Sequence, residues 1–207
     1  MTEKELLQTP EFNSMPIRQT FIEAGLILLK TGGVDNLTLS NLLKQSGHAR
    51  GSFYASFTSK SAYEAEVYWY YFQPQILMIE QLAIDDQLSG HEKLSLWSAR
   101  TLKWMDECLN RGERILTLTE VAARYPEATP PSFLFKTLFG QRTRNFEKIL
   151  SQSSTSDHPN SAEEAGLLLV MLDGVITRAF QCQSLTLAKQ FFSYNFPCQL
   201  ITHGIYD

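Results

Sequence analysis

Apolar residues recur at intervals of three and four along most of this chain, which is the period of amphipathic α-helices. The first such segment carries Phe21, Ala24, Gly25, Leu28 and Leu29 on one face. The same spacing predicts further helices over residues 39–47, 49–57, 60–84, 92–110, 113–124, 131–150, 161–183 and 185–203. No segment shows the sustained alternation of apolar and polar residues that is typical of strands. The predicted fold class is therefore all-α, with about nine helices.

Breaks in this pattern fall at residues 85–90, 126–131 and 151–161, where polar residues, glycine and proline gather. Pro74 lies inside the long segment 60–84, and a proline within a helix predicts a kink. Residues 1–60 are mildly basic and the remaining residues are acidic, which indicates two functions in one chain. We expect a small N-terminal domain over residues 1–60 and a larger helical domain over residues 61–207.

The N-terminal domain contains a helix-turn-helix pattern within the stretch LTLSNLLKQSGHARGSFYASF. Thr38 can cap a helix that begins at the next residue, and Gly47 can supply the positive φ of the tight turn that ends it. A second helix follows from about Ala49. In a helix-turn-helix motif the second helix enters the major groove of DNA.

The polar side of that second helix holds the candidate contacts to DNA. Arg50, Ser52, Tyr54 and Ser56 lie on it, while the phenylalanines between them point back to the preceding helices. Gly51 has no side chain to keep a phosphate backbone away. Lys60 follows and is placed to neutralise a phosphate.

The stretch from Phe21 to Tyr63 resembles the N-terminal domain of TetR-family transcriptional regulators. Its most specific part is Gly51-Ser-Phe-Tyr-x-x-Phe-x-x-Lys60, preceded by Gly47. The resemblance implies a homodimer with two helix-turn-helix heads and a C-terminal domain for ligand binding and dimerisation. It also implies DNA contacts by residues at positions 38, 50, 52, 54 and 60.

Two positions depart from the family pattern. His48 stands where the family usually has a branched apolar residue, and we include it among the candidate DNA contacts. Ala49 stands where the family has Ser or Thr, so the second helix loses a side-chain cap worth about 1 kcal/mol.

Charge is distributed unevenly along the chain. The formal net charge is −4, which by itself argues against binding to nucleic acid. Within residues 14–60, however, five basic residues against two acidic ones leave a net charge of +3. This asymmetry is consistent with a DNA-binding head on an acidic core, although a few scattered charges would also produce it.

The larger domain is rich in aromatic residues, and some of them are candidates to line a ligand cavity between helices. Trp97 and Trp104 are seven residues apart, so they lie on one helix face. A face of this kind also serves ordinary core packing. The candidate ligand-binding residues are Trp97, Trp104, Met105, Cys108, Tyr125 and Phe133. The expected effector is a small apolar or aromatic molecule.

The last two helices are the expected dimer interface. Residues 165–180 are almost entirely apolar, so most sides of this helix must be covered. Asp173 interrupts the run, and Arg178 is its expected partner. An ordinary buried core helix would show the same composition. The candidate interface residues are Gly166, Leu169, Val170, Asp173, Gly174, Thr177, Phe191 and Phe192.

The leading hypothesis, which rests on the resemblance to TetR-family regulators, is a sequence-specific DNA-binding transcriptional regulator, a repressor that a small molecule releases from a palindromic operator. Two other functions remain open at this stage. The chain could be an all-α enzyme or ligand carrier with a vestigial helix-turn-helix, although no nucleophile–base constellation is evident. It could also be a redox sensor that uses Cys108. The nearby Lys103, Arg111 and Arg114 would lower the pKa of this thiol. The plainer interpretation is that Cys108 is a small apolar residue buried in the core.

The scattered histidines and three cysteines predict no metal site and no disulfide framework, and no cofactor motif is present. With no secretory signal or membrane-spanning run, we expect a cytoplasmic protein without membrane contact.

Overall fold

The computed structural model describes residues 16–125, 127–153 and 162–195. These residues form nine α-helices and one short 3-10 helix, and no strand occurs among them, which confirms the all-α prediction. Within the same ranges, no helix is both long enough and apolar enough to cross a membrane. The elements are α2 (Pro16–Gly32), η1 (Val34–Asn36), α3 (Leu39–Ser46), α4 (Arg50–Ser56), α5 (Lys60–Ile84), α6 (Gly90–Asn110), α7 (Leu118–Ala122), α8 (Pro130–Ser153), α9 (Ala162–Gln181) and α10 (Thr186–Asn195).

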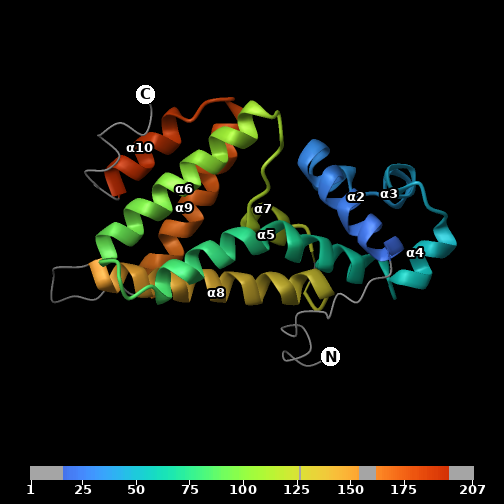
Figure 1. Ribbon diagram of the computed structural model, residues 1–207, viewed down its shortest axis with the longest axis horizontal. Helices are drawn as coiled ribbons and strands as arrows, with labels where there is room; N and C mark the ends of the chain where they lie inside the picture. The colour runs from blue at the N-terminus through green and yellow to red at the C-terminus, as the bar shows by residue number, and fades with distance from the viewer. Residues whose placement is uncertain (1–15, 126, 154–161, 196–207) are drawn as a thin grey trace.

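Helices α2, α3 and α4 gather at one end of the molecule, and the longer helices form the rest (Figure 1). We call residues 16–56 the head and the remaining described residues the core. The head is held by rings packed edge to face: Phe53 lies 5.4 Å from Phe21 and 5.2 Å from Tyr63 between ring centroids. Both phenylalanines are fully buried, so burial of aromatic surface stabilises this small unit.

Helix α5 is part of the core, and its first turns pack against the head. It begins at a cap in which the Ser59 hydroxyl accepts a hydrogen bond from the Ala62 amide, and it continues through Pro74 to Ile84. The apolar cluster that holds the head runs along α5 to Ile76 and reaches Leu138 of α8. The division of the chain at residue 60 therefore stays a prediction, because the packing continues across that point.

The segment 113–124, predicted as one helix, is different in the structure. Residues 113–117 have no regular secondary structure, and only the short helix α7 follows them. The Arg114 amide donates a hydrogen bond to the Lys30 carbonyl at 2.6 Å, which draws the chain toward the head. Thr117 then starts α7 by accepting from the Glu120 amide at 3.2 Å. A long-range contact and a new cap thus replace the expected local helix.

The other predicted boundaries agree with the structure within a few residues where it describes them. Helix α8 continues to residue 153, further than the expected end at residue 150. The expected polar loop beyond that point and the expected extension of the last helix to residue 203 lie outside the described residues.

Candidate nucleic-acid interface and ligand cavity

The helix-turn-helix is built as the sequence predicts. Thr38 caps α3 because its hydroxyl accepts a hydrogen bond from the Asn41 amide at 3.2 Å. Gly47 ends the helix in the left-handed region, with φ of 70° and ψ of 12°, and its amide donates to the Leu43 carbonyl. A residue with a Cβ is strained at that φ, so glycine fixes the turn between the two helices.

Helix α4 starts directly after His48 and Ala49, the two positions at which the sequence departs from the TetR-family pattern. Ala49 precedes the helix in extended backbone and contributes no side-chain cap. His48 is half-buried, and its ring packs at 5.5 Å from the ring centroid of Phe21. The structure therefore gives His48 a packing role in the head, and its contact with DNA stays a prediction.

Helix α4 presents its polar side to solvent. Arg50 and Gly51 are exposed, and Tyr54 is 47% exposed, with the Arg50 guanidinium 5.7 Å from the centre of its ring. Ser52 and Ser56 are half-buried, and the Ser56 hydroxyl donates to the Ser52 carbonyl at 2.9 Å. An arginine lying over a tyrosine ring makes a flat, amphipathic surface.

Ion pairs separate the basic residues of the head and of the first turn of α5 into two groups. Lys60 pairs with Glu64 one turn further along α5, and Arg18 pairs with Glu66. Lys44 and Arg50, in contrast, have no acidic side chain within ion-pair distance among the described residues. Both are exposed, so the uncompensated positive charge of the head lies on α3 and α4.

The position of α4 is fixed from beneath by residues that sequence reasoning did not single out. The Arg18 guanidinium donates to the Ser56 carbonyl at the end of α4 and lies 4.5 Å from the centre of the Phe57 ring. The Tyr63 hydroxyl donates to the Phe21 carbonyl at 2.9 Å. A Cβ on Gly25 would lie 2.2 Å from that hydroxyl oxygen, so the close approach of α2 and α5 requires glycine at this position.

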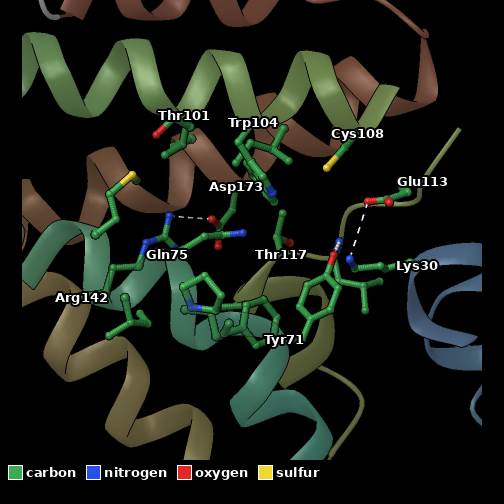
Figure 2. Close-up of a pocket in the computed structure, with 18 of the residues that line it drawn as sticks. Lys30, Tyr71, Gln75, Thr101, Trp104, Cys108, Glu113, Thr117, Arg142 and Asp173 are labelled. Atoms are coloured by element: carbon green, nitrogen blue, oxygen red, sulfur yellow. Dashed lines mark hydrogen bonds and ion pairs between the residues drawn. The ribbon is translucent and has the colours of Figure 1, made fainter. Parts of the chain in front are cut away.

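The core contains a cavity of about 410 Å³, a size typical of small-molecule sites. Helix α6 lies along one side, α5 and α8 along the other, and α9 closes the back (Figure 2). Most of its walls are apolar. The residues that line it are Leu26, Lys30, Tyr70, Tyr71, Phe72, Pro74, Gln75, Ile76, Met78, Ile79, Trp97, Thr101, Trp104, Cys108, Arg111, Glu113, Arg114, Leu116, Thr117, Leu118, Arg142, Leu172, Asp173 and Ile176.

Three of the six predicted ligand-binding residues line this cavity: Trp97, Trp104 and Cys108. The other three do not. Met105 of α6 is fully buried in the apolar cluster of the core, and Phe133 is 46% exposed on α8. The hydroxyl of Tyr125 lies 2.8 Å from that of Tyr68, in a separate aromatic group.

A buried ion pair lies at the polar end of the cavity. Arg142 of α8 donates to one carboxylate oxygen of Asp173 at 2.8 Å, and the amide and hydroxyl of Thr119 donate to the other. Asp173 is 3% exposed. The expected pairing of Asp173 with Arg178 is wrong, because residues five positions apart on a helix point about 140° away from each other.

The environment of Cys108 contradicts the premise of the redox hypothesis. The thiol is buried, and burial together with the neighbouring carboxylate of Glu113 raises its pKa to about 11. Arg111 lowers this pKa by a smaller amount. The thiolate is the reactive form of cysteine, so this thiol is less reactive than an ordinary one at neutral pH.

One end of the cavity lies against the head. Leu26 and Lys30 of α2 line it, and the Lys30 ammonium is 4.0 Å from the carboxylate of Glu113 (Figure 2). The backbone of Arg114 is bonded to Lys30, as described above. Tyr71 joins α5 to the same segment, because its hydroxyl accepts from the Leu116 amide at 2.9 Å. We call Lys30 and residues 113–116 the junction.

Gly33 permits this close contact between the head and the core. Its φ is 71°, and a Cβ there would lie 2.7 Å from the Arg114 Nε. A few residues further on, Asp35 pairs with Arg124, which lowers the pKa of the Asp35 carboxyl. The sequence pattern predicted neither contact, because the paired residues are about 80 to 90 positions apart.

The predicted dimer-interface residues fall into two groups. Val170 and Gly174 are exposed, and Gly166 and Thr177 are half-buried, so they lie on or beside the outer face of α9. Four others are already buried within the chain and cannot form its surface: Leu169, Asp173, Phe191 and Phe192. The outer face instead gains apolar residues that the sequence did not single out: Leu167, Met171 and, on α10, Leu187, which are 62%, 46% and 42% exposed.

Comparison with protein-family models and with curated proteins found no match for this chain. Solved structures do match. The regulatory protein TetR from Rhodobacter sphaeroides aligns with a TM-score of 0.68 at 18% identity, over 86% of this chain and 96% of the other.

Two further regulators show the same similarity. The reduced form of Escherichia coli NemR aligns with a TM-score of 0.66 at 18% identity, over 86% of this chain and 94% of its own. The transcriptional regulator FadR from Bacillus subtilis, in complex with stearoyl-CoA, aligns with a TM-score of 0.62 at 19% identity, over 91% and 99%. At this level of identity the comparisons show that the chain has a TetR-like fold.

Proposed function

We propose that this protein is a dimeric, ligand-responsive regulator that binds a specific DNA sequence through α4 and is released from it by a small molecule. The observation that carries the proposal is the outer side of α4, where Arg50, Gly51 and Tyr54 are exposed without an acidic partner among the described residues. The similarity to TetR-type regulators supports the same function at the level of the fold.

The chemistry of α4 suits readout of a major groove. A guanidinium can donate two hydrogen bonds to one guanine, and a tyrosine can contact phosphate or a base edge. Thr38, Ser52 and Lys60 would contribute contacts at the two sides of the helix. Since Lys60 is paired with Glu64, its contact with phosphate requires exchange of that partner.

Dimerisation is proposed through the outer face of α9 and the adjoining part of α10. Leu167, Val170 and Met171 expose apolar surface there, and Gly174 leaves room for a second helix because no atom of the described residues lies within 4 Å of a Cβ placed on it. Covering this face removes apolar surface from water. A two-fold dimer implies a pseudo-palindromic operator with half-sites about one helical turn apart or somewhat more.

The junction supplies a direct route between ligand and DNA. The cavity wall includes Lys30 of the head helix α2, so a ligand at that end contacts the head and the core together. A ligand changes DNA affinity only if it binds the two arrangements of the head unequally. We propose that filling the cavity shifts α2 against residues 113–116 and so changes the spacing of the two α4 helices in the dimer.

The experiment that tests this function is selection of duplexes from fragmented genomic DNA, followed by affinity measurements at several salt concentrations. The affinity for a selected duplex should fall steeply with salt, because each neutralised phosphate releases counterions. Lys60→Ala should weaken binding to all duplexes and flatten the logarithmic salt slope by about one. Recovery of no sequence above the background, at low and high salt alike, would rule the function out.

A further inference from the structure

The cavity of the core holds polar groups whose hydrogen-bonding capacity the protein itself does not use. Gln75 lies beside the Arg142–Asp173 pair, and Trp104 projects from α6 toward the same space (Figure 2). Neither side chain has a hydrogen-bond partner among the described residues. A ligand that enters the cavity therefore meets polar groups that are free to bind it.

These free groups are mainly donors. Arg142 uses one terminal nitrogen for Asp173 and for the Leu169 carbonyl, which leaves its Nε and its other terminal nitrogen without a partner in the part of the chain that the structure describes. The Trp104 indole can only donate, and the Gln75 amide donates through its nitrogen and accepts through its oxygen. Thr101 adds a buried hydroxyl that has no hydrogen-bond partner within residues 16–125, 127–153 and 162–195.

The carboxylates of the cavity, in contrast, are already neutralised. Asp173 accepts three hydrogen bonds, one of them from Arg142. Glu113 accepts from Arg111 at 2.9 Å and faces Lys30, and the hydrogen bond from Arg111 lowers the pKa of the Glu113 carboxyl. A cationic ligand would have to displace these partners, so the site favours oxygen acceptors over positive charge.

The remaining walls are apolar and largely aromatic. Tyr71 and Phe72 lie on the α5 side, and Trp97 and Trp104 lie on the α6 side. Flat rings pack well between aromatic walls, and a cavity of about 410 Å³ has room for a small fused-ring compound.

From these observations we infer that the cavity binds an aromatic compound, neutral or anionic, that presents a carbonyl or carboxylate oxygen to Gln75, Arg142 and Trp104. The inference rests on the proposed function for its role as an effector. The binding itself is independent of DNA and can be measured without it.

The test uses four naphthalene probes of matched size in calorimetric titrations of the full chain: 2-acetylnaphthalene, 2-naphthoate, 2-ethylnaphthalene and the 2-naphthyltrimethylammonium cation. The ketone or the carboxylate should bind most tightly. The ethyl compound should bind about 2- to 12-fold more weakly, since it lacks one hydrogen-bonded oxygen. The cation should bind most weakly. The relative affinities of the ketone and the carboxylate show whether the cavity prefers the neutral or the anionic oxygen.

Variants locate the site. Gln75→Leu nearly keeps the shape of the wall and Trp104→Phe keeps its aromatic character. Each removes a polar group, so each should reduce the advantage of the ketone over the ethyl probe by about 2- to 12-fold. Gln81→Leu, on the exposed side of the same helix, should leave that advantage unchanged. Unfolding temperatures of all three variants report whether they remain folded.

Tightest binding of the cation, absence of binding by all four probes, or an unchanged preference in folded Gln75→Leu and Trp104→Phe would overturn the inference. Oxygen-selective binding with no effect on a selected duplex would uphold the inference and contradict the proposed ligand response. The two failures are therefore distinguishable.

Discussion

The head and the core of this protein differ in what determines their functional residues. In the head, the features that define the helix-turn-helix depend on neighbours in the sequence: Thr38 caps the helix that follows it, Gly47 ends that helix, and Arg50 lies over Tyr54 one turn away. In the core, the cavity depends on residues from helices far apart in the chain, such as Arg142 and Asp173. A local motif therefore identifies the surface that we propose binds DNA, whereas the ligand site is defined only by packing.

The largest expected effect comes from Gly174→Leu, which tests whether α9 pairs with a second chain. The added side chain has open space around it in one chain, so folding should be retained. In a dimer it would force the paired helices apart. Sedimentation should show monomer, and the affinity for a selected duplex should fall on the order of 100-fold or more, since the second head no longer binds beside the first.

Gln81→Leu is the matched control for Gly174→Leu, because it adds the same side chain to an exposed position on α5. That variant should stay dimeric. A Gly174→Leu protein that remains a stable dimer would place the interface elsewhere.

The second largest effect is expected for Cys108. The sequence indicated a lowered pKa for this thiol, whereas its environment in the structure raises the pKa. With a pKa of about 11, its thiolate fraction at pH 7.5 should be on the order of 100-fold below that of an unperturbed thiol. Alkylation by iodoacetamide should be correspondingly slow beside the exposed Cys182 and should accelerate as the pH approaches 11. Mass spectrometry of single-cysteine variants measures both rates.

The raised pKa of Cys108 also makes the stability of the protein depend on pH. Because the pKa of Cys108 is higher in the folded state than in the unfolded state, its contribution to stability is complete below the unfolded value and is lost as the pH rises toward 11. A Cys108→Ala protein should therefore show a flatter fall in stability over that range. Rapid alkylation of Cys108 near neutral pH would restore the redox hypothesis.

A smaller effect is expected at the junction. Lys30→Met removes the ion pair with Glu113, which is partly exposed and so contributes modestly. The factor by which a releasing ligand weakens duplex binding should change by about 2- to 5-fold, whereas the affinity without ligand should change less. Titration of the duplex with and without ligand measures the factor.

Two variants sharpen the test of the junction. Lys103→Met, at an exposed position of α6 away from the head, should leave the release factor unchanged. Pro74→Ala tests the competing route along α5. If Pro74→Ala changes the factor and Lys30→Met does not, coupling passes through the helix rather than the junction.

Gly51→Ala is expected to have the smallest effect, and it has opposite signs for stability and for binding. Alanine should stabilise the exposed helix by about 0.5–1 kcal/mol, because it loses less conformational entropy than glycine on folding and its Cβ meets no described atom within 4 Å. Duplex affinity should fall, because the methyl group holds the DNA away. Urea unfolding and fluorescence anisotropy measure the two changes; unchanged affinity in the stabilised variant would remove Gly51 from the interface.

Much of the fold followed from the sequence because helical periodicity and caps are local. The failures have a common physical origin. Residues 113–117 leave the helical pattern to contact Lys30, and Asp173 finds its cation on α8 rather than on its own helix. Such pairings depend on which helix faces meet in space.

The candidate sites show the same limit. The apolar run of α9 indicated a helix covered on most sides, yet it could not separate inward Leu169 from outward Leu167 and Met171. Gln75 and Arg142 carried no motif, although an aspartate within an apolar run did indicate that a buried partner was needed.

The most direct test of the central claim is the affinity of wild type and Arg50→Ala for one selected duplex at a fixed salt concentration, with Arg144→Ala as the control for loss of an exposed arginine elsewhere. The account predicts a loss of about 5- to 150-fold, or about 1–3 kcal/mol, for Arg50→Ala and little change for Arg144→Ala. Equal affinity of wild type and folded Arg50→Ala would contradict the assignment of α4 as the helix that reads DNA.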